Sequence, residues 1–273
     1  MIDPTLRLTD DQIAFYRREG YLQLPSITTP EEVASLCDIY DRLFATKAGR
    51  DVGDHLDLSS ADEDGAEAVL PQILNPSKYA PELAATQFRA NAEAIVRQLL
   101  GPEVAFRGDH AIRKAPFSEA ATPWHQDEAY WEPDLEYDEL SIWIPLQPAT
   151  IDNGCMQFIP GSHALDVVPH HPIGNDPRVI GLEVDDAVAR SAGAVACPLP
   201  AGGATIHHSR TLHYTGPNRT AEPRRAYIMA FGAPRKKRAV ARDFYWLVQQ
   251  QTSWQQRRDS AQAAEATGKT DAS

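Results

Sequence analysis

The apolar positions near the start of the chain repeat at helical spacing. Thr9 to Gln12 fits a capping box, in which the first and fourth residues cap each other's backbone, and it predicts a helix through Tyr16. Gly20 is the residue type that ends such a helix, because glycine readily adopts the left-handed conformation. Tyr21–Leu24 then alternates and predicts a short strand.

Two further helices are predicted before residue 102. Thr29-Pro30 is a strong start signal, since proline is favoured at the first helical position. The core face of this second helix is Val33, Leu36, Tyr40, Leu43 and Phe44. A third helix is expected from about Pro81 to Leu100. The acidic stretch 51–67 lacks periodicity and is interpreted as a loop, either plainly solvated or bordering the mouth of an active site.

From Val104 onward the pattern changes to short alternating strands separated by proline and glycine. Such strands are expected at residues 105–113, 142–147, 205–208 and 226–231. This pattern favours a mainly β fold with flanking α-helices, built on a double-stranded β-helix, the cupin-like jelly roll. We expect one domain over residues 1–252, with a helical part at 1–101 and the jelly-roll core at 102–240. Residues 253–273 lack an apolar face and are expected to be a disordered tail.

Composition narrows the functional classes. The chain has 273 residues and a net charge of −12, which argues against nucleic acid or an anionic membrane as a partner. No apolar run reaches the ~20 residues that span a bilayer, and the N-terminus has no secretory pattern. The three cysteines are odd in number and widely spaced, so reduced thiols in a cytoplasmic protein are expected.

Three residues form a candidate metal site. His125 and Asp127 lie two positions apart, so in an extended strand both side chains point to the same face. His213, far downstream, would complete a set of two histidines and one carboxylate. This set leaves open positions on the metal and suits non-haem Fe(II) oxygenases. The triplet alone is also typical of a surface histidine beside a solvated aspartate.

Arg224 strengthens the first interpretation. It follows His213 after a loop rich in turn formers, and it shares its predicted strand face with Ala226, Ile228 and Ala230. An arginine on such a face points inward and needs an anionic partner. A bound carboxylate is a natural bidentate partner, and an internal ion pair is the alternative.

At these residues the chain resembles the phytanoyl-CoA dioxygenase family of Fe(II)/2-oxoglutarate oxygenases, over roughly residues 10 to 235. The matching residues are His125-Gln126-Asp127, Trp143, Asp152-Asn153-Gly154-Cys155, Ile159-Pro160-Gly161-Ser162-His163, His213-Tyr214-Thr215-Gly216-Pro217-Asn218 and Arg224. One departure is Gly202-Gly203, where the family usually has Gly-Asp; it bears only on that turn.

The resemblance implies roles for individual residues. His125, Asp127 and His213 would bind Fe(II), and Arg224 would bind the distal carboxylate of 2-oxoglutarate. Gln126, Trp143 and Thr215 match positions that line this co-substrate in relatives. With O2, such an enzyme would hydroxylate an unactivated carbon of a small organic substrate and release succinate and CO2. Related halogenases have Ala or Gly in place of Asp127, so halogenation is disfavoured.

Several alternatives remain at this point. The same iron centre supports desaturation, epimerisation or ring formation in related chemistry. A non-catalytic or sensor protein that keeps the metal site is a candidate from another class, which the intact triad and Arg224 disfavour, and a cupin-like metal protein without 2-oxoglutarate is a further candidate. His207 and His208 compete with His213 as ligand, although the spacing to Arg224 favours His213. His110 either borders the co-substrate or is a core residue.

The substrate is not determined by the sequence. Tyr130 and Trp131 either wall an apolar pocket or pack in the core. The basic run 235–238 either meets an anion or balances nearby acids, and the acidic composition favours a small metabolite over a CoA thioester.

Overall fold

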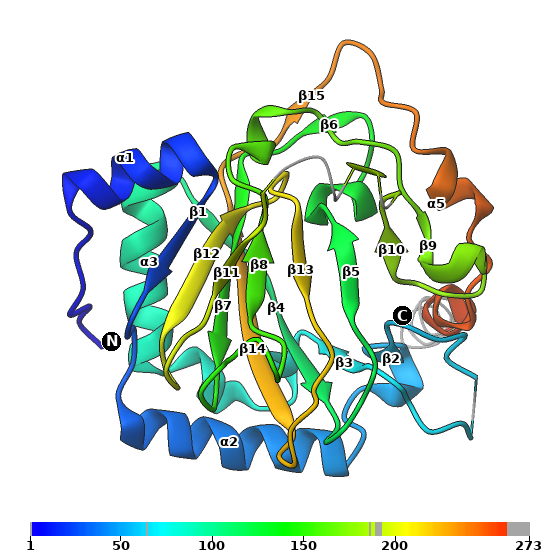
Figure 1. Ribbon diagram of the computed structural model, residues 1–273, viewed down its shortest axis with the longest axis horizontal. Coiled ribbons are helices and arrows are strands. Elements are labelled where there is room, and N and C mark those ends of the chain that lie inside the picture. The colour runs from blue at the N-terminus through cyan, green and yellow to red at the C-terminus, as the bar shows by residue number, and fades with distance from the viewer. Residues whose placement is uncertain (1, 64, 186, 189–192, 261–273) are drawn as a thin grey trace, which may run out of the picture.

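Two antiparallel sheets and a group of flanking helices make up the fold (Figure 1). The computed structural model describes residues 2–63, 65–185, 187–188 and 193–260. The labelled helices of the described residues are α1 (Asp10–Glu19), α2 (Pro30–Ala45), α3 (Gln87–Leu100) and the short α5 (Tyr245–Gln249). The larger sheet contains, in spatial order, β1 (Tyr21–Leu24), β12 (Ala204–His208), β7 (Glu139–Pro145), β14 (Arg224–Gly232), β4 (Ala105–Lys114), β3 (Pro71–Leu74) and β2 (His55–Asp57).

The smaller sheet supplies the opposing layer. Its order is β11 (Val195–Cys197), β8 (Met156–Phe158), β13 (His213–Thr215) and β5 (Thr122–His125). Two short ribbons pair β9 (His171–Pro172) with β10 (Leu182–Glu183), and β6 (Leu135–Glu136) with β15 (Lys236–Lys237). The predicted mainly β jelly roll is confirmed, and the N-terminal part contributes three strands, β1, β2 and β3, to the larger sheet.

Alternation along β14 and β7 separates two cores. Met229 of β14 and Ile142 of β7 point to the outer face of the larger sheet and pack with the helices. Ile228 and Trp143, one position along, pack between the sheets with Phe158 of β8. A strand residue and its next neighbour point to opposite faces, so each strand serves both layers. The inner layer is where functional side chains meet.

The predicted helix signals are largely confirmed. Thr9 and Gln12 form the reciprocal capping box of α1, and Gly20 ends the helix at φ 78°. The expected third helix is interrupted: a 3₁₀ turn covers Pro81–Ala84, and Thr86 then caps α3 through its hydroxyl. Among the described residues, no helix has both the length and the apolar character needed to cross a bilayer.

Two segments differ from the sequence-based expectation. The acidic stretch 51–67 is not only a loop, because it contains the buried strand β2, which pairs with β3. Residues 253–260 of the expected disordered tail are helical, and Trp254 donates a hydrogen bond to the Gly53 carbonyl. This segment has few apolar residues, so its order depends on polar contacts that the sequence pattern does not reveal. Residues 261–273 lie outside the described part of the chain.

The carboxylate of Glu32, on α2, connects two helices and generates a stability prediction. It accepts hydrogen bonds from the Gln87 and Phe88 backbone N–H groups, at 2.6 and 2.8 Å, at the start of α3. Glu32→Ala leaves both donors without this partner, so we expect the free energy of unfolding to fall by about 2 kcal/mol in urea titrations. The control is Glu31→Ala, at an exposed position of α2; an equal loss in both variants would contradict the prediction.

Candidate metal centre and co-substrate pocket

His125 and His213 become neighbours through the pairing of β5 with β13. The two residues are directly opposite in the register, and their ring centroids are 4.1 Å apart. The expected single strand through residues 125–127 is not present, because β5 ends at His125 and a 3₁₀ turn begins at Asp127. Gln126 keeps extended angles (φ −118°, ψ 133°). That single extended residue is enough to direct both neighbouring side chains to the same side.

Ligand atoms from the predicted triad lie within 4.8 Å of one another in the described part of the chain. In each histidine Nδ1 faces a backbone carbonyl: that of Pro123 at 2.7 Å for His125, and that of Thr211 at 2.8 Å for His213. A carbonyl only accepts, so Nδ1 carries the proton in both rings and Nε2 has a free lone pair. The two Nε2 atoms lie 3.7 and 3.4 Å from Asp127 Oδ1. Two imidazole nitrogens and a carboxylate oxygen converge as a divalent metal requires.

The second oxygen of Asp127 is held by residues outside the triad. Ser141 donates a hydrogen bond of 2.8 Å to Oδ2, and His207 Nε2 lies 3.4 Å from the same oxygen. Burial by itself raises the pKa of Asp127. The neighbouring His213 and His207 imidazoles lower it by more than burial raises it, so the pKa of Asp127 lies well below its usual value. Asp127 is therefore ionised, with Oδ1 left to face the histidines. Ser141 was not predicted as a site residue. It lies two positions before Trp143 on the same face of β7, and that spacing was the signal in the sequence.

The competing histidines are separated by the same strand alternation. His207 points between the sheets and uses Nε2 toward Asp127 Oδ2, so that nitrogen acts as a donor. His208 points to the other side, where its Nδ1 accepts a hydrogen bond from the Arg210 backbone at 3.0 Å. The geometry favours His213 over both as the third metal-facing residue.

Arg224 and Lys114 form an excess of buried positive charge. They are opposite each other in the pairing of β14 with β4, and both are almost fully buried. Lys114 Nζ donates to the Thr215 hydroxyl (2.9 Å) and carbonyl (3.0 Å), whereas Arg224 Nε has no hydrogen-bond partner. Burial lowers the pKa of Arg224 to about 10. Burial, and then the charge of Arg224, place the pKa of Lys114 well below its usual value.

No acidic side chain among the described residues forms an ion pair with either cation, so the alternative of an internal pair for Arg224 is not met. Like charges directly opposite in a sheet destabilise it. An anion bound beside Arg224 would remove this cost. Lys114 was not predicted as a site residue: it lies one position beyond the strand expected at residues 105–113, and it is the last residue of β4.

The other predicted co-substrate residues are found in different places. Thr215 and Trp143 line the same cavity as Arg224, which lies 5.6 Å from the Trp143 ring centroid. Thr215 Oγ1 is 3.5 Å from Arg224 Nη2. Gln126 is not among the lining residues; its amide donates to the Arg210 carbonyl and accepts from the Val168 N–H. It points away from the pocket because it alternates with His125 and Asp127.

One cavity of about 320 Å³ contains the triad and the cationic region. His110 lines it and contacts the Gln72 amide at 3.1 Å, so this residue both borders the cavity and is hydrogen-bonded. Tyr130 and Trp131 also line it. The remaining lining residues include Leu56, Leu58, Leu74, Arg107, Ile112, Thr122, Glu139, Met156, Ile180, Ile228, Ala230, Arg235 and Trp254.

The basic run at residues 235–238 is largely paired with acids. Arg235 Nε lies 2.7 Å from Glu139, and Lys237 lies 4.0 Å from Asp134. Arg238 is 3.8 Å from Asp166. This arrangement fits a surface that balances nearby acids, except at Arg235, which reaches the cavity.

Comparison with known proteins agrees with this geometry. Residues 16–226 match the family described as phytanoyl-CoA dioxygenase (PhyH). The chain belongs to the phytanoyl-CoA dioxygenase family. Its helices α2 and α3 and both sheets lie largely within the matched region.

Three proteins with similar sequences or structures carry different names. EvdO2 from Micromonospora carbonacea var. aurantiaca, solved with 2-oxoglutarate, is 37% identical over 90% of this chain and 99% of its own, with a TM-score of 0.75. L-proline trans-4-hydroxylase of Streptomyces griseoviridis is 26% identical over 79% of this chain and 83% of its own. The epimerase SnoN, solved with Fe3+, alpha ketoglutarate and nogalamycin RO, is 25% identical over 84% and 85% of the chains, with a TM-score of 0.65.

The protein is therefore an iron- and 2-oxoglutarate-dependent oxygenase. The residues in the cavity fit these cofactors on their own chemistry. The donor set has free Nε2 atoms beside an ionised carboxylate, and the unpaired guanidinium suits a dicarboxylate.

Unpaired burial of Arg224 leads to a prediction with an unusual sign. Arg224→Met removes a desolvated charge without breaking an ion pair, so in the metal-free, co-substrate-free protein we expect the free energy of unfolding to rise by about 1 kcal/mol. Urea titration measures this change. Arg225→Met is the matched control: Arg225 forms two 2.7 Å contacts with Asp41 on the outer face, and its loss should lower stability by up to about 1 kcal/mol. Equal losses in both variants would show that Arg224 is paired.

Proposed function

We propose that the protein hydroxylates an unactivated carbon of a small organic substrate and releases succinate and CO2, with His125, Asp127 and His213 as the ligands of Fe(II). The observation that carries the metal assignment is the convergence of two free Nε2 atoms on one oxygen of Asp127. Iron with 2-oxoglutarate supplies the oxygen-activating chemistry when both are bound. The remaining tasks belong to the chain.

The first task of the chain is to hold the ligands in one geometry. The Pro123 and Thr211 carbonyls keep the protons of His125 and His213 on Nδ1. Ser141 and His207 restrain Asp127 Oδ2, so Asp127 offers Oδ1 alone. Such outer contacts orient metal ligands and tune their affinity.

The second task is to bind and orient the co-substrate. We assign Arg224 to the distal carboxylate of 2-oxoglutarate, because it is the buried cation with an unpartnered nitrogen in the cavity. Lys114 positions Thr215 beside it through two hydrogen bonds. Trp143 forms an apolar wall next to the guanidinium. Gln126 does not contact the co-substrate in this assignment. Its side chain instead holds the Arg210 and Val168 backbone groups.

Hydroxylation is favoured by the residue at the third triplet position. A halogenase needs an open position on the metal for the halide. Asp127 would fill that position, which disfavours halogenation. The cavity lining has no second metal group among the described residues. The proline hydroxylase relative catalyses a reaction of this class. Epimerisation is the second candidate, because the SnoN relative is named an epimerase.

The alternative of a cupin-like metal protein without 2-oxoglutarate is set aside by the family match, and the cavity agrees. Such a protein would have no need for Arg224 opposite Lys114 in the interior, and the two uncompensated charges would only destabilise it.

Cofactor binding provides the first functional prediction. Anaerobic titration of the apoprotein with Fe(II) and 2-oxoglutarate should give a saturable charge-transfer band in the visible. His213→Ala should lose the band because one ligand is missing. The Arg224→Met variant should still bind iron, but its affinity for 2-oxoglutarate should fall at least about thirtyfold, because the buried charge partner of the co-substrate is removed. Arg225→Met should retain the band; iron binding with no band in the native chain would exclude this proposal.

Product analysis separates hydroxylation from the other oxidative outcomes. A substrate found by succinate release, reacted under isotopically labelled O2, should give a product with one added and labelled oxygen atom. An epimer or a cyclised product of unchanged oxygen content would replace hydroxylation by the second candidate. Asp127→Ala should abolish succinate release in both cases, because it removes a metal ligand.

A further inference from the structure

The C-terminal segment, defined here as residues 253–260, forms part of the cavity wall. Trp254 lines the same cavity as the metal triad, and its indole N–H donates a hydrogen bond of 2.7 Å to the Gly53 carbonyl. In Figure 1 this segment lies beside β2, on the opposite side of the molecule from α1 and α3. The segment therefore contributes Trp254 to the cavity wall from the part of the molecule near β2.

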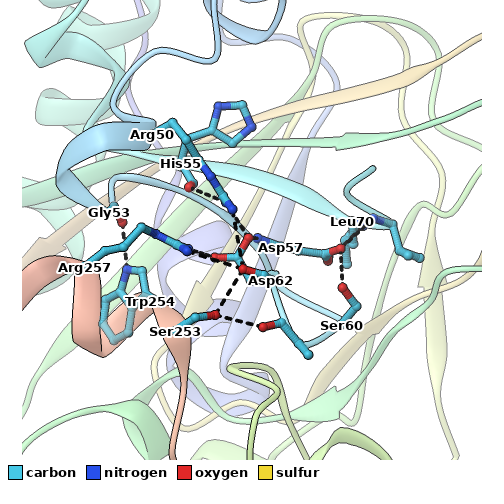
Figure 2. Close-up of polar contacts among 12 residues, drawn as sticks. Arg50, Gly53, His55, Asp57, Ser60, Asp62, Leu70, Ser253, Trp254 and Arg257 are labelled. Atoms are coloured by element: carbon cyan, nitrogen blue, oxygen red, sulfur yellow. Dashed lines mark hydrogen bonds and ion pairs between the residues drawn. The ribbon is translucent and has the colours of Figure 1, made fainter. Parts of the chain in front are cut away.

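Asp62 holds the C-terminal segment in place. Its side chain is 2% exposed, and both Arg50 and Arg257 contact the carboxylate, as Figure 2 shows. Ser253 adds hydrogen bonds to the Ala61 and Asp62 carbonyls, at 2.9 and 3.0 Å. A carboxylate buried between two guanidinium groups is costly to leave unpaired. The attachment is thus specific and depends on charge.

The same carboxylate organises the neighbouring strand. Asp62 Oδ1 accepts the Asp57 backbone N–H at 2.9 Å, and the Asp57 carboxylate accepts the Val69 and Leu70 N–H groups at 2.6 and 3.0 Å (Figure 2). The residues on either side of Asp57, Leu56 and Leu58, both line the cavity. Arg257 is therefore connected through Asp62 and Asp57 to two apolar wall residues.

The polar groups that line the cavity outside the metal and co-substrate residues largely satisfy one another. Glu139 pairs with Arg107 at 3.4 Å and with Arg235 at 2.7 Å, and Gln72 contacts His110. The hydroxyl of Tyr130 accepts the Leu182 N–H, and the Trp254 N–H is used by Gly53. The apolar faces that remain come from Leu56, Leu58, Tyr130, Trp131, Ile180 and Trp254.

We propose that the C-terminal segment completes the substrate cavity, with Trp254 as a specificity-determining residue for the apolar face of a small organic substrate. Arg257 is a positioning residue that acts through Asp62. The inference deepens the proposed function, on which it rests for the identity of the cavity. Aromatic side chains give large apolar contact areas at low entropic cost, which suits Trp254 to this role.

The cavity test uses N-phenyl-1-naphthylamine, a neutral apolar fluorescent probe, with the full chain. The native protein should bind it both with Fe(II) and 2-oxoglutarate under anaerobic conditions and without them. Trp254→Ala should weaken binding about tenfold, and Trp254→Phe should recover part of the loss. Gln256→Ala, at an exposed position of the same segment, is the control and should bind as the native chain does. No binding to the native chain, or equal binding to Trp254→Ala, overturns the proposal.

The positioning role is tested by hydrogen exchange. Arg257→Ala should raise exchange of the backbone amides at residues 57, 58, 69 and 70 about tenfold or more, because Asp62 loses one of its two guanidinium partners. Arg257→Ala should also weaken binding of the fluorescent probe. Arg257→Lys should recover part of the exchange protection and part of the probe binding. Unchanged exchange, or faster exchange without loss of probe binding, overturns the role of Arg257.

Failure of this inference is distinguishable from failure of the proposed function. The charge-transfer band reports iron and 2-oxoglutarate, and Trp254→Ala should leave it unchanged because Trp254 is not among the residues assigned to either. Loss of the band in Trp254→Ala would move this residue into the cofactor site and overturn its assignment to the substrate wall.

Discussion

The pairing of β13 with β5 is the constraint on which the metal site depends. Strand side chains alternate, so a slip of one residue would turn His213 away from His125. The end of β13 is fixed from the larger sheet, where Lys114 donates to both oxygens of Thr215. Gly154 is also required here: it has φ +83°, and a Cβ on it would lie 2.4 Å from the Gly216 carbonyl. The Asn-Gly turn thus permits the close approach that sets the position of His213.

A second feature is that the interior is electrostatically incomplete without a ligand. Arg224 and Lys114 are adjacent, buried and without an acidic partner among the described residues, whereas the outward-facing Arg225 is paired with Asp41. Arg225 therefore stabilises the outer face of β14, and Arg224, its neighbour in the chain, is left free to bind a ligand on the inner face. A dicarboxylate completes the charge balance, so the co-substrate is expected to stabilise the fold as well as to take part in the reaction.

The metal end and the substrate end of the cavity are built in different ways. The metal end is made mainly from the inner face of the two sheets, where β5 and β13 place His125 and His213, and Asp127 follows at the start of a 3₁₀ turn. The substrate end is assembled from connecting segments, and Trp254 reaches it from the C-terminal segment through the Asp62 contacts. Within an iron- and 2-oxoglutarate-dependent family, variation in such segments can change the substrate while the iron chemistry is kept.

Local sequence determined the features that depend on nearest neighbours. The capping box at Thr9, the Thr29-Pro30 helix start and the alternation around Arg224 each specify a local conformation, and all three are present. Together with the motif residues they were enough to predict the jelly roll and the His125–Asp127–His213 group. The tertiary structure alone decided that Lys114 lies opposite Arg224 and that residues 253–260 are ordered. These features arise from pairing between distant segments and from buried charge contacts such as Arg257 with Asp62, and no local periodicity encodes which distant partner a polar side chain will meet.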